Sequence, residues 1–452
     1  MRTQKIPNII HLGAEHSVTG SCLLLQASGL NIMVDCGIAQ GKDRLVPIEN
    51  WPVKPQEVDF LFLTHAHIDH IGRVPELIQK GFKGEILTSH PTKAILGPML
   101  EDAMGFSDMT EQQIAILNQT IDDLSWGFEY NQEFDLKNGI RFKLGRAGHI
   151  LGSCFIRLEM RNPHWSVVFS GDLGAANTPI LPDPDIPEPC DLLILESTYG
   201  NRLHEERQQR VRRLGDVLAR ALSDKGKVFI PSFALGRTQE LIYEMDRLFS
   251  DPESQQGSPD LNPKAKIPVF VDSPLGLEIT KIYSSLSQYW DKEAKQIHHK
   301  GDHPIEFDHL YAVDNYKDHL RLLDTPGPSV IIAGSGMCTG GRIIDHLKKG
   351  LDNSRNDLFF VGYQARGTPG RDIIRYSKRP GGYVYIDGER ITIGARVHTL
   401  TGYSAHADQR GLIEWVESIR ERPEEIKLVH GEPEAQKVLG NKLGTLGYRL
   451  RI

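Results

Sequence analysis

Cysteine and long apolar runs are both scarce in this sequence. The 452 residues include only five cysteines, and no two of them form a CxxC pair: Cys22, Cys36, Cys154, Cys190 and Cys338. Such spacing argues against a disulfide framework and against a cysteine-based zinc knuckle, so we expect a reducing, cytoplasmic setting. No stretch approaches the length of a transmembrane helix, and we expect no membrane partner.

Positive charge is also in deficit, because the formal net charge is −7. This excludes a generally basic protein that coats nucleic acid. If the ligand is a polyanion, the positive charge that meets it must be local and partly supplied by metal ions. The length of the chain predicts more than one domain.

Short apolar segments that end in glycine turns or carboxylates alternate with helical segments, which predicts an α/β protein with parallel strands. The expected strands are 8–13, 21–27, 30–37, 58–66, 164–172, 191–198, 227–233, 266–273, 329–336 and 357–363. The expected helices are 204–222, 236–249, 343–349 and one that begins near Asp408. Residues 251–266, rich in proline, serine and glutamine, are expected to form an exposed loop.

A histidine cluster follows the apolar segment that ends at Thr64. In the sequence HAHIDH, His65, His67, Asp69 and His70 are all ligand types that zinc accepts. Residues two apart on a helix point in nearly opposite directions, whereas at a strand end they can converge on one ion. The alternative is a polar surface turn, but four ligand-type residues in six positions favour a metal site.

Three more candidate ligands stand beside glycine after other extended segments. They are His149 in AGHILGS, Asp172 in FSGDLG and His430 in LVHGE. Any one of them alone is more often a structural residue held by hydrogen bonds. Together with the HAHIDH loop they make seven ligand-type residues, which is enough for two metal ions that share a carboxylate.

These motifs resemble a known family. HAHIDH, AGHILGS and FSGDLG resemble the signature set of the metallo-β-lactamase superfamily, and LESTYGN, TGYSAHAD and LVHGE resemble motifs of its β-CASP branch. That branch includes the endonuclease of pre-mRNA 3′-end cleavage and the RNase J enzymes. The resemblance implies an αββα sandwich with an inserted α/β β-CASP domain over the active-site cleft. We expect residues 1–200 to form the first part of the metallo-β-lactamase domain, residues 201–370 the inserted β-CASP domain, and residues 371–452 the second part of the metallo-β-lactamase domain.

The resemblance also implies a role for each motif residue. One zinc ion would be held by His65, His67 and His149, the other by Asp69, His70 and His430, and Asp172 would bridge the two. Asp35, in VDCG, would orient the metal-binding loop or cap a turn, and both roles are compatible. Asp69, Glu196 and His406 are the expected catalytic residues, with His406 as a general acid oriented by Glu196. The alternative for His406 is that it only caps the helix near Asp408.

The expected substrate is RNA, because a histidine at the position of His430 resembles the RNA-processing members, and we expect this RNA to be single-stranded. The glycine-rich turns suggest phosphate contacts. The candidate contacts are Arg237, Gly334, Ser335, Gly336, Arg342 and Arg366. The alternative is that these glycines only pack turns and the arginines are ordinary surface charges. We interpret His398 as structural, and the cluster His298, His299 and His303 as solvated surface.

The expected reaction is phosphodiester hydrolysis by a hydroxide that two zinc ions activate, giving 5′-phosphate and 3′-hydroxyl ends. Three alternatives stay open: a small-molecule ester or thioester hydrolase of the same fold, a DNA nuclease, and a non-catalytic RNA-binding scaffold. The sequence leaves endonuclease or exonuclease mode open, and it is compatible with a homo-oligomer.

Overall fold

The computed structural model describes residues 7–205, 207–250 and 267–451. It divides into two compact units, the first formed by residues 1–203 and 406–452 and the second by residues 204–405. The first unit therefore takes described segments from both before and after the second unit, which is an insertion. The expected loop 251–266 lies outside the described residues.

The first unit contains two six-stranded sheets, each part parallel and part antiparallel. The first sheet has the order β1 (Asn8–Gly13), β2 (Cys22–Ala27), β3 (Leu30–Val34), β4 (Phe60–Phe62), β5 (Glu85–Ser89), β6 (Ser125–Phe128). The second has the order β20 (Glu425–Val429), β11 (Leu192–Glu196), β10 (His164–Phe169), β9 (Cys154–Arg161), β8 (Ile140–Arg146), β7 (Glu133–Asp135).

These two sheets share one apolar core. Phe62 of the first sheet meets Phe142 of the second with their ring centroids 5.1 Å apart and the rings edge to face. Phe142 also lies 5.0 Å from Phe128 and 5.3 Å from Phe134. Apolar residues from β2, β3, β9, β10 and β11 complete the cluster. Burial of these side chains from both sheets is what holds the sandwich together.

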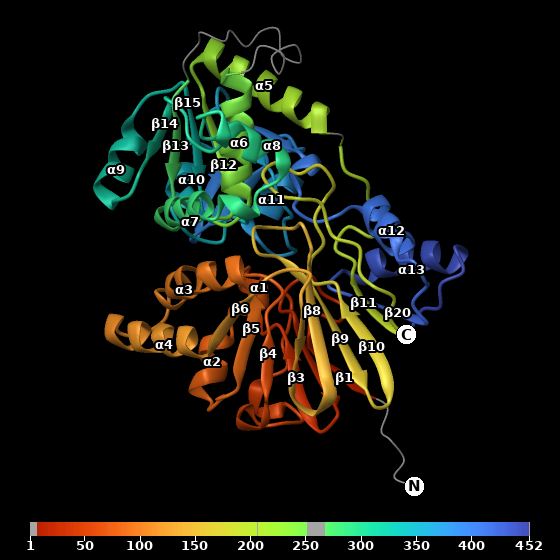
Figure 1. The fold of residues 1–452 in the computed structure, drawn as a ribbon. Coiled ribbons are helices and arrows are strands. Elements are labelled where there is room, and N and C mark those ends of the chain that lie inside the picture. The colour runs from red at the N-terminus through yellow and green to blue at the C-terminus, as the bar shows by residue number, and fades with distance from the viewer. Residues whose placement is uncertain (1–6, 206, 251–266, 452) are drawn as a thin grey trace. The chain divides into compact units, whose positions relative to one another are not determined.

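Helices cover both outer faces of the sandwich (Figure 1). On one side lie α1 (Ile68–Ile71), α2 (Val74–Gln79), α3 (His90–Met104) and α4 (Glu111–Leu124). On the other side lie α12 (Gln409–Ser418) and α13 (Pro433–Thr445), which pack against β10, β11 and β20. The expected face of α12 is buried, since Leu412, Trp415, Val416 and Ile419 all lie in this cluster. The expected αββα sandwich is confirmed.

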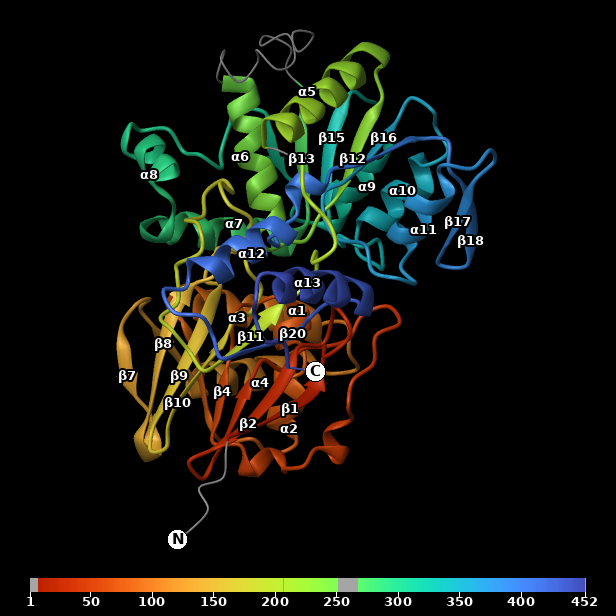
Figure 2. The ribbon, with the colours of Figure 1, turned by 90° about the vertical axis from the view of Figure 1, so that its right-hand side faces the viewer.

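The second unit is built on one parallel sheet. Its order is β14 (Leu310–Ala312), β13 (Val269–Asp272), β15 (Ser329–Ala333), β12 (Lys227–Pro231), β16 (Asp357–Phe360), β19 (Arg396–Thr399). Around it lie α5 (Arg207–Asp224), α6 (Arg237–Ser250), α7 (Pro274–Ser285), α8 (Lys292–His299), α9 (Tyr316–Asp324), α10 (Ile343–Gly350) and α11 (Pro369–Tyr376) (Figure 2). The hairpin of β17 (Tyr383–Ile386) and β18 (Glu389–Thr392) follows α11. This unit is the expected α/β insertion.

The second unit ends later than the sequence suggests. Residues 371–405 belong to it, whereas we expected a return to the first domain near residue 370. The reason is β19, which pairs in parallel with β16 and completes the edge of the inserted sheet. The five cysteines are buried and form no disulfide. Among the described residues, no helix is both long and apolar enough to cross a membrane.

The shared core of the first unit makes a stability prediction. Phe142→Ala should lower the free energy of unfolding by about 3–5 kcal/mol, because it removes a ring that is 3% exposed and leaves a cavity between the sheets. Chemical denaturation of wild type and variant measures the change. Phe106→Ala is the matched control, since that ring is 81% exposed. Equal stability of the two variants would contradict a core centred on Phe142.

Candidate metal centre

The loop after β4 carries four of the expected ligands. His67 is the N-cap of α1, so His65 and His67 precede the helix, and His70 lies within it. The amide of Cys36 donates to the carbonyl of His70 at 2.7 Å. A Cβ at Gly37 would overlap the carbonyl oxygen of Asp69, so only glycine allows this approach. The segment after β3 therefore fixes the backbone of the ligand loop.

His65, His67, His149 and Asp172 point their donor atoms toward one centre. Nδ1 of His67 lies 3.1 Å from Nε2 of His65 and 3.1 Å from Nε2 of His149. Oδ2 of Asp172 lies 3.6 Å from Nε2 of His65 and 3.7 Å from Nε2 of His149. The structure thus brings together three histidines from two distant segments, with one carboxylate oxygen on the side facing the second centre.

A second set converges beside the first. Nε2 of His70 lies 3.1 Å from Nε2 of His430. Oδ2 of Asp69 lies 3.8 Å from Nε2 of His70 and 3.6 Å from Nε2 of His430. Oδ2 of Asp172 is 3.4 Å from Nε2 of His70, so one oxygen atom faces both sets. This is the arrangement that two metal ions with a bridging carboxylate require.

The donor atoms have the spacing of a coordination shell. A tetrahedral zinc ion with bonds of about 2.0–2.1 Å holds neighbouring nitrogens about 3.3–3.4 Å apart. The nitrogen pairs of both sets are 3.1 Å apart, which is within a few tenths of an ångström of that distance. Asp172 is 2% exposed and its Oδ1 accepts no hydrogen bond from the described residues. The residues therefore fit a pair of divalent ions.

The charge state of the site also fits a metal. Burial lowers the pKa of His65 well below its ordinary value and that of His67 to about 4, so both rings are neutral and offer a lone pair. Burial works in the same direction on His70, but Asp172, Asp35 and Asp69 outweigh it and raise that pKa well above its ordinary value. Three carboxylates around one imidazole call for cationic charge, which metal binding supplies as it releases the proton.

Asp35 stands behind this second donor set. Its Oδ2 lies 2.7 Å from Nδ1 of His70, on the side of the ring away from the donor nitrogen. Its Oδ1 accepts hydrogen bonds from the amide and the hydroxyl of Thr64 at 2.8 and 3.0 Å, and the hydroxyl of Ser21 donates to Oδ2 at 3.2 Å. A carboxylate in this place fixes the tautomer and the direction of the ligand ring.

Glu196 and His406 meet at the edge of the centre. Nδ1 of His406 lies 3.2 Å from both carboxylate oxygens of Glu196 and 3.7 Å from Oδ2 of Asp172. Burial opposes protonation, but the Glu196 and Asp172 carboxylates raise the pKa of His406 to about 9. The amide of Leu173 donates to Glu196 at 2.7 Å and fixes it. The pairing with Glu196 therefore favours the protonated form of the His406 imidazole.

The alternative role for His406, as a helix cap, belongs to another residue. Asp408 is the N-cap of α12 and accepts from the amide of Gly411 at 2.9 Å. His406 precedes it and forms an isolated antiparallel bridge with Gly174, two residues after Asp172. This bridge places the ring next to the shared carboxylate.

Two expected substrate contacts lie inside the second unit instead. Arg237 is buried and pairs with Glu240. Nη1 of Arg342 donates to Oδ1 of Asp272 at 2.8 Å and to the carbonyl of Val313 at 2.7 Å. The structure therefore corrects the expectation that these two guanidinium groups are free to meet phosphate. They link elements of the unit to one another.

The glycine-rich turn before α10 also closes on itself. The amide of Ser335 donates to the carbonyl of Gly340, and the amide of Ile343 donates to that of Gly334, both at 3.0 Å. The amide of Thr339 donates to the hydroxyl of Ser335 at 2.9 Å. These donors are satisfied within the turn, so packing explains this part of the sequence better than an anion site does. Gly336 accepts from Gln364 at 2.8 Å.

Arg366 is exposed on the loop before α11 and remains an expected substrate contact. His398 bonds Asp357 at 2.7 Å, which agrees with a structural role. His298 and His299 are exposed, and the ring of His303 packs against Trp290.

A buried cluster around Asp272 was not predicted from the sequence. Its Oδ2 lies 2.6 Å from Nδ1 of His319 and 2.6 Å from Nε2 of His346. These distances are those of charge-assisted hydrogen bonds, and Arg342 already supplies positive charge on the other oxygen. We therefore interpret the cluster as a hydrogen-bonded network. Its members are 47 and 74 residues from Asp272, which is why spacing could not reveal it.

Comparison with known families covers most of the chain. A model described as "Metallo-beta-lactamase superfamily" matches residues 18–231, a "Beta-Casp domain" matches residues 238–373, and a "Zn-dependent metallo-hydrolase RNA specificity domain" matches residues 390–452. A crystal structure of a protein of unknown function from Enterococcus faecalis superposes with a TM-score of 0.53. It is 12% identical and covers 99% of this chain and 97% of that one, which is a likeness in fold alone.

Several curated proteins match nearly the whole of this chain. Ribonuclease TTHA0252 from Thermus thermophilus is 36% identical over 98% of this chain and 97% of its own length. Transcription termination factor FttA from Methanocaldococcus jannaschii is 30% identical, and the match covers 93% of this chain and 66% of that protein. Cleavage and polyadenylation specificity factor 73 from Drosophila melanogaster is 30% identical over 93% of this chain and 59% of its own length.

Fold, donor atoms and matched domains agree on the class of protein, which is a metal-dependent hydrolase. The order of the three matched domains and the identity to the Thermus protein go further. This chain belongs to the β-CASP branch of the metallo-β-lactamase superfamily.

The contact between Asp35 and His70 makes a prediction about metal affinity. Asp35→Asn should weaken metal binding by about 10–100-fold, because the amide cannot hold Thr64 and the imidazole as the carboxylate does. Asn tolerates the φ of +60° at this position, so the backbone is kept. Competition with a chromophoric chelator measures the affinity.

The matched control for this change is Asp191→Asn. That carboxylate accepts from the amide and hydroxyl of Ser166 at 2.6 and 2.8 Å, and no histidine is among its hydrogen-bond partners in the described chain. If both variants bind metal as wild type does, Asp35 has no part in orienting the ligand.

Proposed function

We propose that this protein is a zinc-dependent ribonuclease that holds two zinc ions and hydrolyses phosphodiester bonds to 5′-phosphate and 3′-hydroxyl ends. The observation that carries this is the seven-residue donor set, in which both triads face the same oxygen of Asp172. Two relatives, a ribonuclease and a cleavage factor, and the matched RNA specificity domain support RNA as the substrate.

The ligands divide as the geometry groups them. His65, His67 and His149 would hold one ion, and Asp69, His70 and His430 would hold the other. Asp172 would bind both. When bound, such a metal pair lowers the pKa of a coordinated water and stabilises charge on phosphoryl oxygens.

The protein's own contribution to the chemistry is a proton. His406, held by Glu196, would donate from its ring to the departing 3′ oxygen. Glu196 is buried and bonded to the amide of Leu173, so it fixes the ring and keeps it protonated. His406 is 14% exposed in its side chain, which leaves it open to a substrate oxygen.

The binding of RNA to this acidic chain needs local positive charge. The metal pair would supply part of it, and Arg366, exposed before α11, is our proposed contact from the second unit. We propose that the RNA is single-stranded. The donor residues are nearly all buried, and a single strand can bring one phosphate to such a site more readily than a duplex can.

The test is incubation of wild-type protein with 5′-labelled single-stranded RNA and zinc, with the chemistry of both product ends mapped. We expect 5′-phosphate and 3′-hydroxyl ends and about two zinc ions per chain by elemental analysis. Asp172→Ala should lose most of the zinc and all measurable cleavage, because it removes the ligand shared by both sets.

One zinc ion or none in zinc-loaded wild type would contradict the two-metal site. Cleavage of single-stranded DNA or of thioesters with RNA left intact would instead favour a DNA nuclease or a small-molecule hydrolase.

His406→Ala should keep both metals and lower kcat by about 10²–10⁴-fold, since a positioned general acid contributes that much. Single-turnover cleavage with metal content measured on the same sample separates the two effects. His398→Ala is the control, because His398 is also paired with a buried carboxylate but lies in the second unit. Turnover like that of wild type in the His406 variant would remove it from the mechanism.

A further inference from the structure

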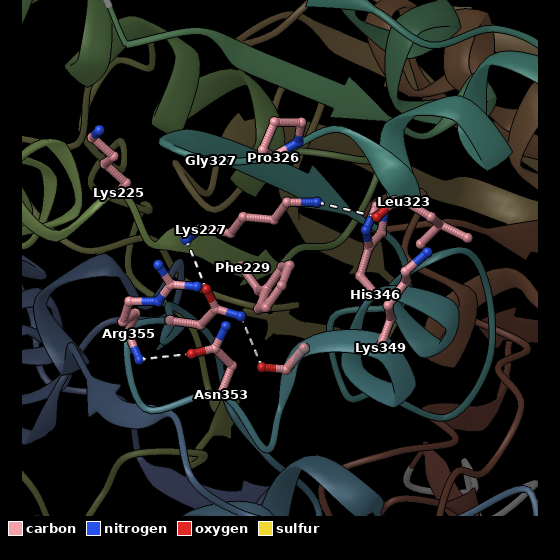
Figure 3. A pocket seen from close by; sticks show the side chains of 12 residues that line it. Lys225, Lys227, Phe229, Leu323, Pro326, Gly327, His346, Lys349, Asn353 and Arg355 are labelled. Atoms are coloured by element: carbon pink, nitrogen blue, oxygen red, sulfur yellow. Dashed lines mark hydrogen bonds between the residues drawn. The ribbon is translucent and has the colours of Figure 1, made fainter.

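A basic pocket lies within the second unit, at the edge of its sheet where the strands begin. The loops that lead into β12, β15 and β16 line it, together with the last turn of α10 (Figure 3). The strands are parallel, so these loops meet at the same edge. The cavity has a volume of about 310 Å³, at the lower end of the range for small-molecule sites. The glycine-rich turn 334–342 follows β15 and so lies beyond the other end of the strands.

The walls of this pocket are built by close contact between the loops. A Cβ at Gly226 would overlap the carbonyl oxygen of Arg355, and one at Gly327 would lie 2.6 Å from that of Lys225. The amide of Lys227 donates to the side chain of Asn356 at 2.8 Å. The three loops therefore form a fixed rim.

The lining of the pocket is cationic. Four of its residues are Lys225, Lys227, Lys349 and Arg355, and none of its lining residues is acidic. Lys349 pairs with Asp324, which does not line the pocket. Both side chains are exposed to solvent, so this ion pair is weak. No carboxylate in the described parts of the chain pairs with the side chains of Lys225 or Arg355. This concentration of positive charge stands out in a chain of net charge −7.

One lysine of the set is held in place. Nζ of Lys227 donates to the carbonyl of Leu323 at 3.3 Å (Figure 3). It also donates to the carbonyl of Leu322 at 3.2 Å, and both acceptors lie at the end of α9. Burial, followed by the charge of Lys349, lowers its pKa. Cations that repel one another across a pocket are stabilised by a bound anion.

We propose that this pocket binds the phosphate of a nucleotide, as a site separate from the metal centre. The class of ligand rests on the proposed function, because substrate and products of a ribonuclease carry phosphate on a nucleoside. The volume exceeds what a phosphate group alone requires and leaves room for part of the attached nucleoside. The nucleotide comes either from a free mononucleotide or from a segment of the RNA chain, and both present the same group.

The test removes the two cations without a carboxylate partner. Lys225 has a φ of +59°, which asparagine tolerates, so the variant is Lys225→Asn with Arg355→Gln. The control carries Lys281→Gln and Lys292→Gln, two exposed lysines of the same unit that do not line the pocket. Binding of uridine monophosphate and of a single-stranded RNA oligonucleotide is measured across a salt series for wild type and both variants.

We expect the pocket variant to bind at least one of the two probes at least several-fold more weakly than the control does. If the RNA chain occupies the pocket, the salt dependence of RNA affinity should also be weaker in the pocket variant. Its log–log slope should fall by about one unit for each removed cation that contacts phosphate. Loss of mononucleotide binding with RNA affinity unchanged identifies a free nucleotide as the ligand. Bound nucleotide should also protect Lys225 of wild type from acylation, as seen by mass spectrometry.

Unchanged affinity for both probes, relative to the control, overturns the proposal. Thermal unfolding of both variants shows that the fold is kept, as the exposure of the four side chains predicts. Cleavage of labelled RNA by wild type is followed in parallel. Intact cleavage with unchanged binding removes only the pocket, whereas absence of cleavage removes the proposed function whatever the binding shows.

Discussion

One oxygen atom, Oδ2 of Asp172, is the point on which the metal centre depends. It faces His65 and His149 on one side and His70 on the other. A carboxylate that is 2% exposed loses its hydration and must be stabilised by its surroundings. The histidines around it do this only in part, because burial holds His65 and His67 neutral. The site is thus arranged for cations, and the fold places the ends of β4, β8, β10 and β20 together to build it.

The sequence draws attention to the candidate donors that the structure brings together because these residues stand next to strand ends. Apolar strands that end in HAHIDH, GDLG or HGE bring six of the seven candidate donors to strand ends, and His149 follows β8. Packing of the two sheets against one shared core brings these strand ends together. The sandwich of helices and sheets followed from the family resemblance, and the parallel insertion from the alternation of strands and helices. The expected roles of Asp35 and Glu196 came only from resemblance, and the contacts of each carboxylate with a histidine are compatible with those roles.

The sequence fails where a residue's partner is distant in the chain. Arg342 beside a glycine-rich turn suggests a phosphate contact, but Asp272, 70 residues earlier, holds its guanidinium. The second unit extends to residue 405 because β19 adds to a sheet edge, and β19 is too short and too polar to be recognised as a strand. The basic pocket is hidden for the same reason, since its cations come from positions 225 to 355 and meet only when the strands align.

The second unit uses the two ends of its sheet differently. Where β13 ends, Asp272 bonds His319, His346 and Arg342, and His319 bonds Asp345 as well. Where the strands begin, Lys225 and Arg355 carry positive charge that no described carboxylate balances. His346 belongs to both regions, because it lines the pocket and bonds Asp272. An anion in the pocket would thus lie near an imidazole ring whose Nε2 bonds Asp272, the same carboxylate that pairs with Arg342, so His346 is a short physical connection between the two ends of the sheet.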